Sequence, residues 1–119
     1  MIKQLSLSLI AMSAFALSSC GRASSTDPVY KAFEANAAAD RINLSQYSGY
    51  TVEYVNERAR LFCRLMDSGD VVKLTTQLSF GDTPGGLFSK PDNGGVLQKI
   101  IWRSGTPILC PQHNQYLRQ

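Results

Sequence analysis

The chain contains few of the residues that catalysis, metal binding or nucleic-acid binding usually requires. It has one histidine, His113, which follows Pro111 in a polar C-terminal stretch, where a lone histidine is more often solvated than catalytic. Its three cysteines do not belong to a ligand cluster with metal-binding spacing. The formal net charge is only +3, too small an excess to indicate nucleic-acid binding. We therefore expect no enzymatic activity, metal, cofactor or nucleic-acid partner.

One long apolar run is present, at the N-terminus. Residues 5–17 are uncharged and follow Lys3, a length that suits a signal-peptide core and is too short to span a membrane. The run ends in Leu17-Ser18-Ser19-Cys20, which resembles the lipobox of bacterial lipoproteins. That resemblance implies cleavage before Cys20 and acylation of the cysteine, and Gly21 after it favours the outer membrane. The alternative is a secreted protein cut near Ala14, with Cys20 in a disulfide.

The lipobox assignment divides the chain and fixes the state of the other cysteines. Residues 1–19 become a signal peptide, residues 20–26 a lipidated N-terminus with a flexible tether, and residues 27–119 one small domain, which we expect at the periplasmic face of the outer membrane. Cys63 and Cys110 then remain as an even pair in an exported chain, which predicts a disulfide. The alternative is a pair of free buried thiols.

Two helices are expected in the first half of the domain. Asp27-Pro28 is a typical helix start, and Val29, Phe33 and Ala37 lie on one stripe of a helix over 28–42. Residues 51–66 fit two periods, one helical and one of two short strands joined by a turn. We favour the helix, ended at Ser68-Gly69, because its charge order suits the helix dipole.

Strands are expected in the second half. Val72, Leu74, Leu78 and Phe80 alternate with polar residues over 71–80, which indicates a half-buried strand. Further strands are predicted over 96–103 and 107–110, with Ser104-Gly105 as a tight turn and residues 111–119 as a loose tail. The predicted fold is α+β, with two N-terminal helices packed on a short antiparallel sheet and one disulfide.

Two groups of residues are candidates for binding a partner. The glycine-rich connection 81–95 carries Leu87 and Phe88, which either insert into a partner or fold back over the sheet edge. Arg58, Arg60 and Arg64 form either a solvated face or a docking surface for an acidic partner. We therefore expect a non-enzymatic accessory that binds another envelope protein.

Two resemblances suggest what such an accessory does. The order of elements over Thr51–Cys110 is similar to the α/β-type secretin pilotins, lipoproteins that escort secretin subunits to the outer membrane. Phe62-Cys63, Val72-Lys73-Leu74, Trp102 to Gly105 and Cys110 are similar to membrane-bound inhibitors of animal-type lysozyme. The first implies a pilotin or secretion-system assembly factor. The alternatives are an inhibitor or immunity lipoprotein and a phage-exclusion or conjugation lipoprotein.

Overall fold

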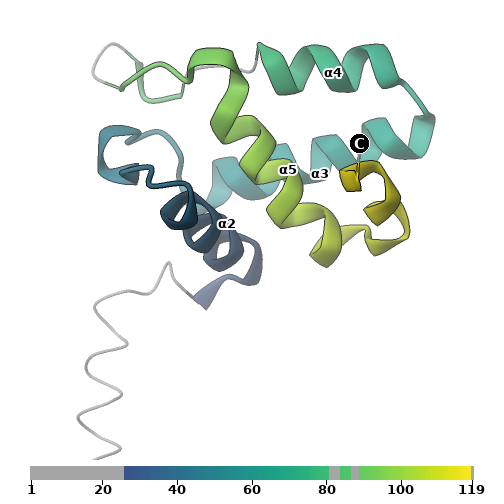
Figure 1. Cartoon of the computed structure of the whole chain (residues 1–119), viewed down its shortest axis with the longest axis horizontal. Coiled ribbons are helices and arrows are strands. Elements are labelled where there is room, and N and C mark those ends of the chain that lie inside the picture. The colour runs from purple at the N-terminus through teal and green to yellow at the C-terminus, as the bar shows by residue number, and fades with distance from the viewer. Residues whose placement is uncertain (1–25, 81–83, 87–88, 119) are drawn as a thin grey trace, which may run out of the picture.

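The computed structural model describes residues 26–80, 84–86 and 89–118, and every regular element within these ranges is a helix. The α-helices are α2 (Pro28–Ala39), α3 (Val52–Ser68), α4 (Val71–Ser79) and α5 (Val96–Leu109). Short 3₁₀ helices stand between or after them, namely η2 (Leu44–Gln46), η4 (Asn93–Gly95) and η5 (Pro111–Arg118). Helix α5 crosses the middle of the domain and contacts α2, α3, α4 and η5 (Figure 1).

The expected α+β fold is wrong, because the predicted strands are helices in the described part of the chain. Residues 71–79 form α4, which buries Leu74 and Leu78 and leaves Val72 exposed, as is Phe80, the residue that follows the helix. A spacing of four residues places two side chains on one helix face, whereas the alternating pattern had suggested a sheet. The pattern therefore satisfied both periods over this short segment.

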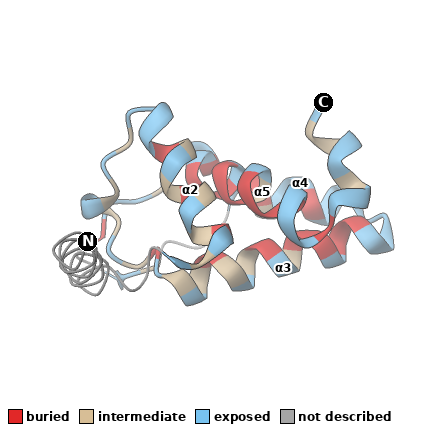
Figure 2. Ribbon diagram, turned by 90° about the horizontal axis from the view of Figure 1, so that it is seen from below, coloured by how far each residue is buried: buried red, intermediate tan, exposed pale blue. Residues whose placement is uncertain are grey.

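The other predicted strands, and the turn predicted between them, lie in helix α5 and at its C-terminal end. Its buried positions include Leu97, Ile100, Ile101, Ser104 and Gly105, which follow a helical spacing. Ser104 and Gly105 thus lie inside the helix rather than in a turn. Figure 2 shows α5 as largely buried, in contrast to the mostly exposed α4. The central helix, rather than a sheet, is what α2 and α3 pack against.

The two N-terminal helices are confirmed, with the predicted start at Asp27 and the predicted end at Gly69, although the first helix ends at Ala39 and not near residue 42. The Asp27 carboxylate accepts a hydrogen bond from the backbone N–H of Tyr30 at 2.8 Å, and α2 buries Val29, Phe33 and Ala37. Helix α3 ends at Gly69, whose φ of 73° is left-handed, as glycine at a helix C-terminus commonly is. The helical alternative for 51–66 is therefore the correct one.

The predicted disulfide between Cys63 and Cys110 is also confirmed, and its Cα atoms are 6.0 Å apart. It joins α3 to the residue that ends α5, rather than to a strand. The segment after it, expected to be loose, forms η5 and packs against α5. Cys20 and the segments 1–19 and 20–25 lie outside the described residues.

Candidate functional site

Helix α4 begins at a well-formed cap and lies beside α3. The Asp70 carboxylate accepts a hydrogen bond from the backbone N–H of Lys73 at 3.0 Å, which satisfies a free donor of the first turn. The inner side of α4 buries Leu74 and Leu78, and the helix contacts α3 and α5. In Figure 1, α4 lies along one edge of the domain, so its outer side is open.

The outer side of α4 carries the most exposed large apolar side chains of the described residues. Val71 is 58% exposed, Val72 79% and Phe80 82%. They lie around an open hollow of about 320 Å³ on this helix. We call this surface the α4 face, defined by the residues that line the hollow: Val71, Val72, Thr75, Thr76, Ser79 and Phe80.

The chemistry of the α4 face suits contact with an apolar partner. None of its six residues is charged. The Thr76 hydroxyl donates to the carbonyl of Val72 at 2.9 Å, so it already has a hydrogen bond when water is removed. Burying a valine or phenylalanine side chain contributes about 1.5–3 kcal/mol. The grouping of Val71, Val72 and Phe80 on one exposed surface makes this face the candidate interaction site.

The sequence pattern did not predict this site, because as a strand it placed Val72 and Phe80 on the buried side with Leu74 and Leu78. A signal was nevertheless present. Asp70 stands three residues before Lys73, the spacing of a helix cap, and Leu74 and Leu78 are four residues apart. A helix that begins at Val71 and turns those leucines inward leaves Val72 pointing outward.

Arg58, predicted to contribute to a docking surface, is instead part of an internal network. Its Nε donates to Oε1 of Gln98 at 3.0 Å, and one terminal nitrogen donates to Oε1 of Gln77 at 2.9 Å. The guanidinium carbon also lies 5.2 Å from the centre of the Phe62 ring. Arg58 thus links α3 to α4 and α5, and its role in this geometry is structural.

The other predicted binding residues do not gather with it. Arg60 and Arg64 are exposed on α3, consistent with either the solvated face or the docking surface proposed for them. Leu87 and Phe88 lie outside the described residues. Among the three arginines, the structure therefore separates Arg58 from Arg60 and Arg64.

Gln98 is the centre of the network that holds α3 and α5 together. It is completely buried, and its Nε2 donates to the Tyr54 hydroxyl at 2.9 Å and to the Tyr50 hydroxyl at 3.4 Å. Tyr50 in turn donates to Asp92 at 3.4 Å. Burial and the charge of Asp92 raise the pKa of the Tyr50 hydroxyl well above its usual value, so it stays protonated and serves as a donor.

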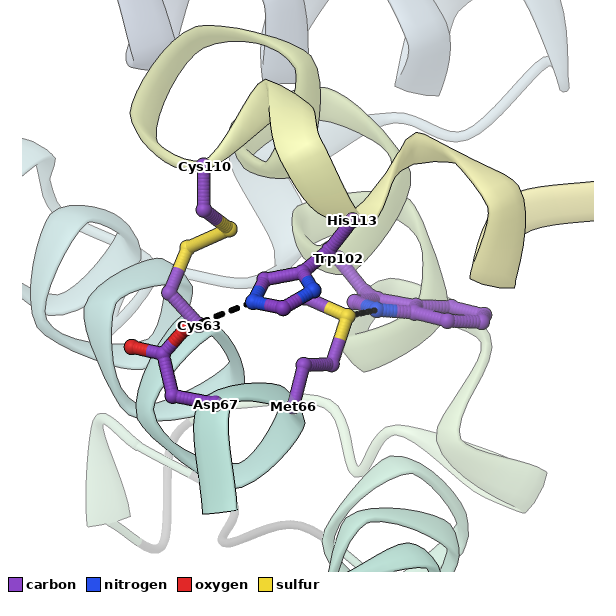
Figure 3. Close-up of a disulfide and its surroundings, with 6 residues drawn as sticks. All are labelled: Cys63, Met66, Asp67, Trp102, Cys110 and His113. Carbon is purple, nitrogen blue, oxygen red and sulfur yellow. Dashed lines mark hydrogen bonds and ion pairs between the residues drawn. A yellow bond between two sulfur atoms is a disulfide. The ribbon is translucent and has the colours of Figure 1, made fainter. Parts of the chain in front are cut away.

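His113 is not a freely solvated residue, contrary to expectation. Its side chain is 15% exposed and its Nε2 lies 2.6 Å from Oδ1 of Asp67. The contact lies beside the disulfide, where the indole N–H of Trp102 donates to the sulfur of Met66 at 3.5 Å (Figure 3). The Asp67–His113 contact holds η5 against the end of α3, and the Trp102–Met66 contact joins α5 to α3.

A second hollow, of about 630 Å³, lies at the start of α3 beside η2. Tyrosine rings and hydroxyl groups dominate its wall, and Glu53 carries the one carboxylate among the residues that line it. Burial and the charge of Glu34 raise the pKa of the Tyr30 hydroxyl, which donates to the carbonyl of Tyr50 at 3.2 Å. This hydroxyl is therefore held as a neutral structural donor.

No described helix is both long and apolar enough to span a membrane, and no three histidine, cysteine, aspartate or glutamate side chains of this part of the chain meet as a metal site. No family model, curated protein or solved structure matches the chain. What the fold defines is a small helical, disulfide-bonded domain with one apolar helix face open to solvent.

Proposed function

We propose that this protein is a lipid-anchored accessory of the bacterial outer membrane that acts, without catalysis, by binding another protein through the α4 face. The N-terminal pattern ending at Cys20 supports the anchor. The observation that carries the binding role is the exposure of Val72 and Phe80 on an uncharged helix surface. Removing these side chains from water favours association, and a periplasmic position presents the face to other envelope proteins.

This proposal is coarser than the pilotin or inhibitor roles. The pilotin resemblance depended on strands between Cys63 and Cys110, and the described part of this region is helical. The inhibitor resemblance used Val72-Lys73-Leu74 and Trp102 to Gly105, and these segments lie in α4 and α5. What remains is a protein-binding role for the α4 face, in assembly or in escorting a partner. An amphipathic helix or helix pair is the usual complement of such a face.

The test has one arm for the anchor and one for the face. Wild-type protein should incorporate a labelled fatty acid, and Cys20→Ser should abolish the label and leave precursor. A photo-crosslinking amino acid at position 72 should capture a protein in intact cells, whereas the same group at Lys31, an exposed position on α2, should not. Labelled Cys20→Ser protein contradicts the anchor, and equal capture at both positions contradicts the face.

A further inference from the structure

The hollow of about 630 Å³ at the start of α3 differs in chemistry from the α4 face. Three tyrosines, Tyr30, Tyr47 and Tyr50, line it together with the hydroxyl groups of Ser45 and Thr51. Its volume lies within the range of roughly 300–1,000 Å³ that small-molecule sites occupy. We call it the tyrosine hollow, and it shares no residue with the α4 face.

The tyrosine rings are held in place by the core behind them. Tyr50 is buried and its ring stacks on that of Phe33, with the ring centroids 6.2 Å apart. The Tyr47 ring meets Tyr50 edge-on, with the centroids 6.0 Å apart. The Tyr30 hydroxyl donates to the backbone carbonyl of Tyr50. The wall is therefore formed before a ligand arrives, which lowers the entropic cost of binding.

The polar groups of the wall offer both kinds of hydrogen bond. The Ser45 hydroxyl donates to Oδ1 of Asn43 at 2.7 Å, so its oxygen is left to accept from a ligand. The Thr51 hydroxyl accepts from the backbone N–H of Tyr54 at 3.1 Å, so its proton is left to donate. Glu53 adds a carboxylate acceptor. This wall suits a ligand whose own hydroxyl groups both donate and accept.

The charges around the tyrosine hollow disfavour ions of either sign. Glu53 carries the one carboxylate of the wall, and none of the described residues that line the hollow is basic, so an anion meets repulsion there. The ammonium nitrogen of Lys90 lies 5.7 Å from the centre of the Tyr47 ring. That ring already has a cation within the range of a cation–π contact, and a second cation would be repelled by the first. A neutral ligand meets neither repulsion.

We propose that the tyrosine hollow binds a short neutral saccharide. A sugar ring has C–H groups on its faces and hydroxyl groups around its rim. The C–H face packs on the partly exposed ring of Tyr47. Rim hydroxyls donate to Ser45 and Glu53 and accept from Thr51. This binding site is separate from the α4 face and does not depend on the proposed function.

Saturation-transfer difference NMR on the full-length protein in detergent micelles tests the proposal, because it reports which ligand protons touch the protein. The probes are a trimer of N-acetylglucosamine, which represents cell-wall glycan, and maltotriose, which represents glucose polymers. Tetramethylammonium is the cationic probe. We expect transfer to the ring C–H protons of at least one saccharide, and the saccharide that responds identifies its source. No transfer from wild-type protein to either saccharide overturns the proposal.

Variants locate the binding. Tyr47→Ala should weaken saccharide binding by at least about five-fold, whereas Tyr47→Phe, which keeps the ring, should stay within about two-fold of wild type. Ser45→Trp, at an exposed position, fills the hollow and should weaken binding as much, so the test does not depend on the folding of Tyr47→Ala. Val72→Ser, on the α4 face, should leave saccharide binding unchanged.

Three results would overturn the proposal in different ways. Saccharide binding that is equal in wild type, Tyr47→Ala and Ser45→Trp would place the ligand elsewhere. Transfer to tetramethylammonium that Glu53→Gln removes, without transfer to a saccharide, would show a cation site. Loss of saccharide binding in Val72→Ser alone would move the site to the α4 face. Capture of a protein at position 72 is measured separately, so the proposed function and this site can fail independently.

Discussion

The contact between α3 and α5 makes a sharp prediction about packing. Helix α5 places Gly105 against Ala59 of α3, so closely that a Cβ at position 105 would lie 2.5 Å from the Cβ of Ala59. Non-bonded carbon atoms prefer separations of about 3.5–4.0 Å. Gly105→Ala would therefore require the helices to move apart by about 1 Å at a fully buried crossing, where side chains interdigitate closely.

The magnitude follows from two opposing effects. Alanine is better than glycine in a helix interior by about 1 kcal/mol, whereas overpacking a buried site costs about 1–3 kcal/mol. We expect Gly105→Ala to lower the free energy of unfolding by up to about 2 kcal/mol, measured by urea denaturation. Ala59→Gly alone should also destabilise, through helix propensity and a small cavity. The double variant Ala59→Gly with Gly105→Ala restores one methyl group at the crossing.

Comparing the double variant with the two single variants tests whether positions 59 and 105 are in direct contact. Because the two positions are in contact, the double variant should be more stable than the sum of the single effects by at least about 1 kcal/mol. Gly69→Ala is a contrasting control, since Gly69 has open space around it and its cost comes from φ alone. A Gly105→Ala protein at least as stable as wild type, or strictly additive effects, would refute the proposed crossing.

Three further predictions test a helix cap, the disulfide and a buried hydrogen bond. Asp27→Ala should cost about 1 kcal/mol at pH 7. Hydrogen bonds from Asn56 and from the Tyr30 backbone lower the pKa of Asp27, so its contribution is complete above the usual carboxyl pKa of about 3.9 and is lost as pH falls through the lower folded value. The difference between wild type and Asp27→Ala should thus shrink in acid, and a pH-independent difference would contradict this. Replacing Cys63 and Cys110 together by serine should lower the free energy of unfolding by about 4 kcal/mol, given the separation of 47 residues between them. Added reductant should then have no further effect on the variant. A variant as stable as the wild type would contradict the stabilising role of the disulfide. Arg58→Ala should lower the free energy of unfolding by about 2 kcal/mol, because it leaves the oxygen of buried Gln98 unpaired. The exposed control Arg60→Ala should change the free energy of unfolding by no more than about 0.5 kcal/mol. A larger loss for Arg60→Ala than for Arg58→Ala would contradict the internal role of Arg58.

Features set by local chemistry could be predicted from the sequence. Asp27 before Pro28 marks where α2 begins, and Gly69 marks where α3 ends, because capping and a left-handed φ are properties of a few neighbouring residues. The pairing of Cys63 with Cys110 followed from an even count after Cys20 was assigned to lipid. These predictions did not require knowledge of what packs against what.

The candidate site could not be predicted in the same way. Arg58 and Arg60 are both arginines on one helix, yet one is held by Gln98 and Gln77 and the other is exposed. Their difference depends on α5 and α4, which are distant in sequence. The exposure of Phe80 likewise depends on which side of α4 meets the rest of the domain.

The sequence by itself determined the helix ends near Asp27 and Gly69, the disulfide and the expectation of a lipid anchor at Cys20. Only the tertiary structure decided that residues 71–79 and 96–109 are helices. A short segment such as Val72 to Phe80 satisfies the strand and helix periods equally, so the choice falls to packing. Leu74 and Leu78 find α3 and α5, and the side chains opposite them are left to form the α4 face.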